Sequence, residues 1–193
     1  MNRRRNHQAV RWLTRMALLT AAAVVLGYIE HLIPMPGSIP GIKLGLANTV
    51  LLYAIYLLDV KSAFLLMVLK VGLSGLMYGG VSAMMFSFGG GLCSLVMMLL
   101  VKKLGGSGVS IIGVSVVGAV FHNVGQTAVA AFMVNTAALM GYVPFLLVAA
   151  VVTGVLTGIA GKYAIQGLRA SGLENVSMPG KEPKQEHPQE EHK

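Results

Sequence analysis

The stretch Ser62–Val101 reads SAFLLMVLKVGLSGLMYGGVSAMMFSFGGGLCSLVMMLLV, and Lys70 is its single charged residue. A membrane-spanning helix needs about 20 mainly apolar residues. This stretch is about twice that long, and Gly79 and Gly80 divide it. It therefore predicts two spanning helices, Ser62–Gly79 and Val81–Val101, and places the chain among membrane proteins.

Four further stretches are apolar enough to span a bilayer, although the second is short. They are Trp12–Ile33, Ile42–Leu58, Val109–Val134 and Tyr142–Ile165. With the first two, they predict an all-α, six-helix transmembrane bundle over residues 12–168. A basic, cytoplasmic N-terminal segment (1–11) precedes it, and a polar tail (169–193) follows that is predicted to be disordered.

Composition agrees with a membrane protein, since 55% of the 193 residues are hydrophobic, 11% are charged and the mean hydropathy is +0.71. Soluble domains carry about 25% charged residues. The net charge of +8 is confined to the ends and short loops, so it indicates membrane topology and not nucleic-acid binding. The single cysteine, Cys93, lies in an apolar run and is predicted to be a small packing residue.

The placement of Lys and Arg predicts the orientation in the membrane. Of the 15 basic residues, Lys43 falls outside and Lys70 within a span, so 13 lie in segments that are inside if the N-terminus is inside. The positive-inside rule then predicts a multi-pass protein of the plasma membrane with both termini in the cytoplasm.

Lys70 is the clearest candidate for a functional residue within a span. A charge at the bilayer centre costs roughly 2.5–3.5 kcal/mol on insertion scales, so it tends to have a partner or a task. Ser74 and Tyr78 follow at helical spacing and form a polar stripe with it. Ligand or ion contact is one interpretation, and a lysine that reaches toward the membrane interface is the other.

A second polar group lies in the fifth predicted span, where His122, Asn123, Gln126 and Thr127 fall within two helical turns. Residues 122 and 126, like 123 and 127, share a face. The group predicts the wall of a ligand site. The alternative is a network of hydrogen bonds between helices, worth on the order of 0.6 kcal/mol per contact.

The segment Pro34–Gly41 predicts a structured outer loop, which leads to Lys43 and Asn48 at the start of the second span. A lysine at a helix N-terminus is unfavourable for the helix dipole and suggests attraction of an anion. A lysine at the lipid headgroups is the alternative. Glu30 and His31 end the first span on the same side, so the polar groups predict a pocket in the outer half of the bundle.

The sequence lacks the motifs of several enzyme classes. It has no Walker A motif, and its single aspartate, Asp59, rules out an Asp-rich magnesium–diphosphate motif. We find no Ser-His-Asp set and no metal cluster, so the chain is predicted to be neither an enzyme nor the holder of a cofactor. GxxxG patterns at Gly75–Gly79 and Gly154–Gly158 are interpreted as helix packing within the chain. The run Gly89–Gly91 indicates a loosened helix, or close approach of a ligand or a neighbouring helix.

Three segments carry a resemblance to a known family: Pro36-Gly37, Pro40–Asn48 and Phe121–Gln126. In these the chain resembles the bacterial Gx transporter family, also called heptaprenyl diphosphate synthase component I, over roughly residues 12–168. That family is similar to the substrate-binding S components of energy-coupling factor (ECF) transporters. The resemblance implies a six-helix subunit that binds a vitamin- or precursor-like solute from outside and works with a membrane T subunit and two ATPases.

S components carry an Ala-x-x-x-Ala motif on the first helix for docking of the T subunit, and Ala17 and Ala21 match it here. The predicted ligand-binding residues are Lys43, Asn48, Lys70, Ser74, His122, Asn123 and Gln126. Two other functions stay open. The chain could be an accessory component of isoprenoid or quinone biosynthesis that binds a prenyl diphosphate or quinone, or, with less support, a membrane enzyme that uses His122 as acid or base.

Overall fold

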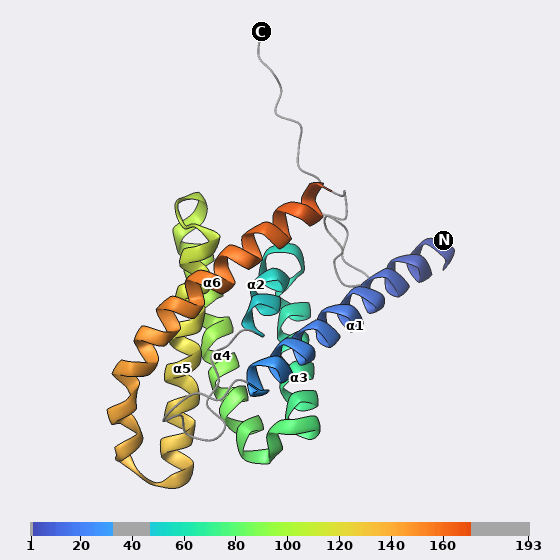
Figure 1. Ribbon diagram of the computed structural model, residues 1–193. Coiled ribbons are helices and arrows are strands. Elements are labelled where there is room, and N and C mark those ends of the chain that lie inside the picture. The colour runs from blue at the N-terminus through green and yellow to red at the C-terminus, as the bar shows by residue number, and fades with distance from the viewer. Residues whose placement is uncertain (1, 33–46, 171–193) are drawn as a thin grey trace.

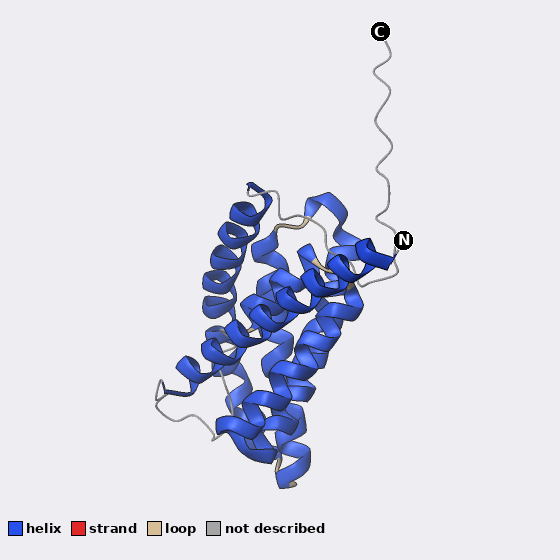
Figure 2. Cartoon of the chain, turned by 90° about the vertical axis from the view of Figure 1, so that its right-hand side faces the viewer, coloured by secondary structure: helices blue, strands red, loops and turns tan. Residues whose placement is uncertain are grey.

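The chain is helical in the part that the computed structural model describes, residues 2–32 and 47–170. The α-helices are α1 (Asn2–Leu32), α2 (Asn48–Leu57), α3 (Val60–Ser74), α4 (Gly80–Gly105), α5 (Ile111–Val134) and α6 (Val143–Ala170) (Figure 1). A π-helical turn, Gly75–Gly79, joins α3 to α4, and short 3-10 turns precede α5 and α6. No residue in these ranges lies in a strand (Figure 2), so the all-α prediction is confirmed there.

The prediction of six spanning helices is wrong in number. Four helical segments of the described chain are long and apolar enough to cross a membrane: His7–Leu32, Val60–Gly105, Ile111–Val134 and Val143–Gly167. They make the chain a multi-pass membrane protein. The third and fourth predicted spans form one helical run of 46 residues, because a π-helical turn, and not a loop, joins α3 to α4.

The described helix of the second predicted span is too short to cross a membrane. Helix α2 has 10 residues, or about 15 Å at 1.5 Å per residue, which is half of the roughly 30 Å hydrocarbon core. Residues 42–46 of the predicted span lie outside the described residues. A short apolar helix within a bundle is suited to packing against neighbours on several sides, and most of α2 is buried.

The run Val60–Gly105 folds back on itself near Gly80, whose φ of 72° lies in the left-handed region that favours glycine. A Cβ added at Gly75 would lie 2.8 Å from the Cβ of Met84, and one at Gly91 would lie 3.1 Å from the Cγ of Met67. These contacts pair the end of α3 with the start of α4, and the middle of one helix with the middle of the other. The two helices therefore lie antiparallel, as Figure 1 shows.

The two ends of the bundle differ in composition. One end gathers the first and last described helical turns and the α2–α3 and α4–α5 connections (Figure 1). We call it the basic end, because Arg11, Lys61, Lys103 and Lys162 belong to the helix ends found there. The opposite end, which we call the turn end, holds the Gly75–Gly80 turn and the α5–α6 connection. Location of the basic end in the cytoplasm stays a prediction of the positive-inside rule.

At both termini, the bounds of the helices differ from the predicted domain limits. Helix α1 begins at Asn2, so it includes the segment that was predicted as a separate N-terminal part. Helix α6 continues to Ala170, and the tail from 171 lies outside the described residues.

Glycines set how closely α4 approaches its neighbours. A Cβ at Gly90 would lie 2.6 Å from the carbonyl oxygen of His122 on α5, and one at Gly89 would collide with Val129 on the same helix. Gly91 faces Met67 of α3. The sequence indicated either a loosened helix or close approach of a ligand or helix at Gly89–Gly91. The structure shows close approach of neighbouring helices, which small residues allow.

The pattern Gly154–Gly158 packs within the chain, as predicted. A Cβ at Gly154 would lie 2.7 Å from the Cα of Val116, and one at Gly158 would lie 2.8 Å from the Cα of Ile112. Helices α5 and α6 thus meet backbone to backbone. Cys93 lies against Gly125 at the α4–α5 contact, although its side chain is exposed.

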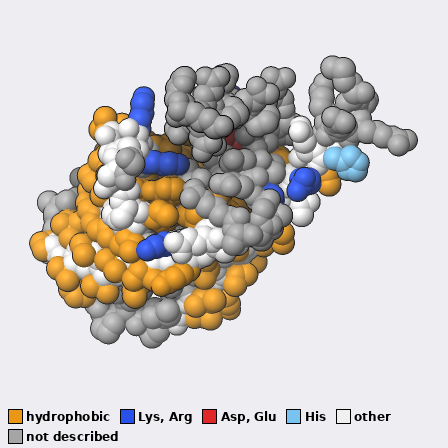
Figure 3. Space-filling view, turned by 90° about the horizontal axis from the view of Figure 1, so that it is seen from above, with side chains coloured by type: hydrophobic (Ala, Val, Ile, Leu, Met, Phe, Trp, Pro, Cys, Tyr) orange, Lys and Arg blue, Asp and Glu red, His pale blue; other side chains and the backbone are white. Residues whose placement is uncertain are grey.

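The outer surface is largely apolar, as Figure 3 shows for the face seen from the basic end. Phe132 is 87% exposed, Leu76 84% and Phe145 62%. Surfaces of this kind are avoided in water, where exposed apolar patches mark contact with a partner or membrane. Lipid tails are a suitable surrounding for them, in agreement with the four candidate spans.

Candidate functional site

A small cavity lies toward the turn end, where four helices bring polar side chains together. Its polar lining residues are Glu30 of α1, Lys70 and Ser74 of α3, Ser87 of α4 and His122 of α5. The volume within it that the centre of a water molecule can occupy is about 20 Å³. A water needs about 10–15 Å³ on this measure, so the cavity has room for about one.

Lys70 is held by a specific partner across the helices. Its Nζ donates a hydrogen bond to the Oδ1 of Asn48, at 2.9 Å. Asn48 is the first residue of α2 and is buried. The ammonium group is therefore directed into the bundle, where an amide oxygen partly replaces the water that it loses in the membrane.

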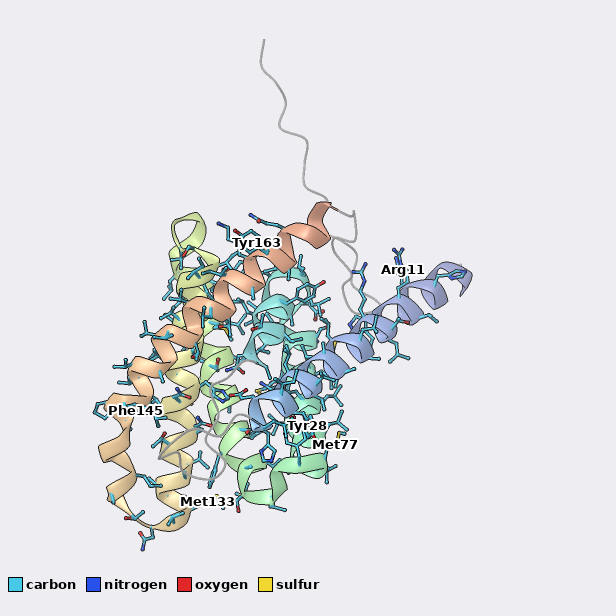
Figure 4. All side chains as sticks on the ribbon, in the orientation of Figure 1. Arg11, Tyr28, Met77, Met133, Phe145 and Tyr163 are labelled. Atoms are coloured by element: carbon cyan, nitrogen blue, oxygen red, sulfur yellow. The ribbon has the colours of Figure 1, made fainter. Side chains whose placement is uncertain are left out.

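Tyr78 contacts two residues that line the cavity, Ser74 and Gly27. Its hydroxyl lies 2.9 Å from the Oγ of Ser74 and 3.2 Å from the carbonyl oxygen of Val24, and can donate its one proton to either. The rings of Tyr28 and His31 lie 5.5 and 5.4 Å from the ring of Tyr78. Figure 4 shows Tyr28 at the lower end of α1, beside the turn that carries Met77.

Gly27 makes this approach of α1 possible. A Cβ at Gly27 would lie 2.5 Å from the hydroxyl oxygen of Tyr78 and 3.8 Å from the Cβ of Ala47. A side chain here would push α1 away from the cavity. Sequence reasoning missed Gly27 and Ser87, because neither stands out among the many small residues of the chain.

Glu30 brings a negative charge to the same cavity as Lys70. Its side chain is 6% exposed although it stands near the end of α1. Sequence reasoning grouped Glu30 with the other polar residues in one half of the bundle but did not include it among the ligand-binding residues. The signal was available, since Glu30 is the only acidic residue that precedes Asp59.

The polar residues of α5 divide into two groups. His122 lines the cavity, whereas Asn123 and Gln126 are not among its lining residues. The Nε2 of Gln126 donates to the Oδ1 of Asn123 at 2.9 Å, and the Nδ2 of Asn123 donates to the carbonyl oxygen of Leu146 on α6 at 3.1 Å. Asn123 therefore makes a hydrogen bond between helices, the alternative given above, and Gln126 joins it from within α5.

Of the remaining predicted residues, the structure describes Ala17 and Ala21. Lys43 and the loop Pro34–Gly41 are outside the described residues. Ala17 and Ala21 are exposed on α1, one turn apart, and their docking role stays a prediction. In the described part of the chain, no three His, Cys, Asp or Glu side chains come together in a way that could hold a metal ion.

An apolar groove borders the polar cavity. It has a volume of about 490 Å³ and lies where α3, α4 and α5 meet. Its wall includes Val68, Val71, Gly72, Met85, Phe88 and Val129. Val71 lines both the groove and the cavity, and a Cβ at Gly72 would meet nothing within 4 Å. A flexible apolar group could lie in this groove with a polar group near Lys70.

Comparison with known proteins identifies the family. No curated protein and no solved structure matched the chain. Residues 19–164 match the family described as heptaprenyl diphosphate synthase component I. This match covers 146 of the 193 residues, including every residue that lines the cavity. As the sequence motifs predicted, the chain belongs to the heptaprenyl diphosphate synthase component I family.

Proposed function

We propose that the chain is a membrane-embedded binding subunit of a transporter, which holds a small charged solute near Lys70 and His122. The observation that carries the proposal is the meeting of Glu30, Lys70 and His122, from three different helices, at one cavity. Ionisable side chains within a membrane are expensive, and they mark ligand or ion pathways when they converge.

The charges in the cavity suggest the kind of solute. Lys70 offers a cation to a carboxylate or phosphate, and Glu30 offers an anion to an amine. A small zwitterionic or anionic vitamin or precursor fits this pattern. The room for about one water is far below the roughly 300–1,000 Å³ of ordinary ligand pockets. Binding must therefore move side chains or the end of α1, where Gly27 and Tyr78 are in contact.

Transport would take its energy from other chains, since the sequence has no Walker A motif. A membrane T subunit with two ATPases is the partner set that the S-component resemblance suggests. The exposed pair Ala17 and Ala21 on α1 would meet the T subunit.

The test is ligand identification on gently purified protein by mass spectrometry, followed by thermal stabilisation with vitamins, flavins and quinone precursors. A true ligand raises the melting temperature of the wild type, and Lys70→Met and His122→Ala abolish this rise. Lys103→Met is the matched control, because Lys103 is exposed at the basic end. Loss of the rise in the control as well, or its persistence in Lys70→Met, would contradict the proposal.

A second candidate is an accessory component of isoprenoid or quinone biosynthesis. It is favoured by the family's description and by the groove that shares Val71 with the cavity. A prenyl diphosphate or quinone would place its polar head near Lys70 and its chain in the groove. Gly72→Leu adds a side chain to the groove wall at a position where a Cβ would meet nothing within 4 Å, and it should displace such a lipid.

The same variant separates the two candidates. Gly167→Leu is the matched control, since Gly167 is also helical and its added Cβ would meet nothing within 4 Å. Co-purified prenyl lipid that disappears in Gly72→Leu, but not in Gly167→Leu, supports the accessory role. Binding of a small solute that is unchanged in both variants supports the transporter role.

A further inference from the structure

A second groove lies on the other side of α2, between α1 and α6. Its volume is about 480 Å³, and its wall includes Leu18 of α1, Tyr53 and Leu57 of α2, and Ala164 of α6. The small Ala164 leaves space on the α6 side. The described lining residues of the groove and of the polar cavity are all different, so we treat its occupant as independent of the solute proposed above.

Among the described residues in the wall of this groove, Arg15 is the single charged one. The position of Arg15 along the axis of the bundle follows from two contacts of α1. Gly27 faces Ala47 just before α2, and the Nε1 of Trp12 donates to the Oγ of Ser62 beyond the other end of α2, at 2.9 Å. Helices α1 and α2 are therefore antiparallel, and Arg15 lies toward the C-terminal end of α2.

The groove thus has a charged end and an apolar body. Its charged end is the one nearer the basic end of the molecule, where Lys and Arg side chains appear in Figure 3. Arginine is suited to phosphate, because its planar guanidinium can donate two parallel hydrogen bonds. The body of the groove follows α2 from Leu57 to Thr49, toward the middle of the bilayer.

The geometry points to a bound anionic phospholipid, with its phosphate at Arg15 and one acyl chain along α2. Charge complementarity selects this occupant. A neutral lipid would gain the apolar contacts but bring no anion to the guanidinium, whereas an anionic lipid is complementary to both parts of the groove. Basic residues next to spanning helices attract anionic lipids for the same reason.

The test is native mass spectrometry of the full chain, titrated with phosphatidylglycerol or with phosphatidylcholine of the same acyl chains. We expect one tightly bound phosphatidylglycerol and weaker binding of phosphatidylcholine. Loss of one basic contact should weaken phosphatidylglycerol binding roughly fivefold in Arg15→Gln. Arg11→Gln is the control, since Arg11 is exposed one turn earlier on the same helix (Figure 4) and should leave binding unchanged.

Two further variants test the groove itself. Arg15→Lys keeps the charge and should retain most of the preference for the anionic lipid. Ala164→Phe fills the groove and should weaken both lipids alike. Equal affinity for the two lipids in the wild type would overturn the proposal. Equal effects of Arg15→Gln and Arg11→Gln would do the same, as would a neutral prenyl lipid that occupies the groove in preference to phosphatidylglycerol.

Discussion

The ammonium group of Lys70 donates to the side-chain oxygen of Asn48 across 2.9 Å, and so joins α3 to the first residue of α2. Both residues stood out in the sequence as polar groups in apolar surroundings. Their contact ties the short helix α2 to the longest helical run of the chain, next to the cavity.

The Lys70–Asn48 pair should show a measurable coupling energy. Asn48→Leu removes one partner of a charged donor, and hydrogen bonds to charged groups contribute about 1.5–3 kcal/mol. Lys70→Met/Asn48→Leu should be less destabilised than the sum of the single variants, by about 0.5–3 kcal/mol. Unfolding in detergent measures all four proteins of the cycle. Additive effects would mean that the bond contributes nothing to stability.

Gly27 should tolerate no side chain unless Tyr78 changes with it. Gly27→Ala places a Cβ 2.5 Å from the Tyr78 hydroxyl oxygen, and overpacking of this kind typically costs about 1–3 kcal/mol. Gly27→Ala/Tyr78→Phe removes the colliding oxygen and should recover part of the lost stability. Melting temperatures of the three variants decide the matter, and a double variant less stable than Gly27→Ala would exclude the collision as the cause.

Asn123 and His122 should differ in what their loss affects. Asn123→Ala breaks the hydrogen bond to the carbonyl oxygen of Leu146, and contacts of this kind average about 0.6 kcal/mol in membranes. We expect a small loss of stability with ligand stabilisation intact. His122→Ala should reduce ligand stabilisation, because His122 lines the cavity. Thermal shift with and without ligand measures both the stability and the ligand stabilisation of each variant. Loss of ligand stabilisation in Asn123→Ala, but not in His122→Ala, would place the site on the α6 side of α5.

Trp12 reports on the basic end, because it is the only tryptophan in the chain. Its Nε1 donates to Ser62, whose hydroxyl in turn donates to Asp59 at 2.6 Å. Ser62→Ala removes the acceptor for Trp12 and should cost about 0.5–1.5 kcal/mol. Acrylamide quenching of the fluorescence should increase as this part of α1 loosens. Ser110→Ala is the control, since Ser110 caps α5. Quenching unchanged in Ser62→Ala would mean that packing alone holds Trp12.

Much of the site could be predicted from the sequence, because polar groups are costly in an apolar environment. Lys70, Asn48 and His122 each lack an obvious purpose in a span, and the structure places Lys70 and His122 at one cavity. What could not be predicted is the rotation of each helix. Successive residues of a helix lie about 100° apart, so His122 and Asn123 cannot both face the cavity, and the packing of α4 and α6 decides between them.

The number of spans was the main error, and its cause is conformational. A pair of glycines between two apolar stretches indicates a loop, but here Gly79 ends a π-helical turn and Gly80 begins α4. Hydropathy cannot distinguish the two outcomes, because neither changes the composition. For the second predicted span, the structure describes the helix Asn48–Leu57, and residues 42–46 lie outside the described part.

The glycines of α4 determine how the sequence can vary at this contact. Gly89 and Gly91 each face a side chain, that of Val129 or Met67, so a larger residue could be accepted there if its neighbour became smaller. Gly90 faces the backbone carbonyl oxygen of His122, and no substitution at position 122 removes that oxygen. In a library of random variants, we therefore expect larger residues at position 89 or 91 only together with a smaller residue at the facing position. At position 90 no second substitution can restore stability, so we expect glycine alone.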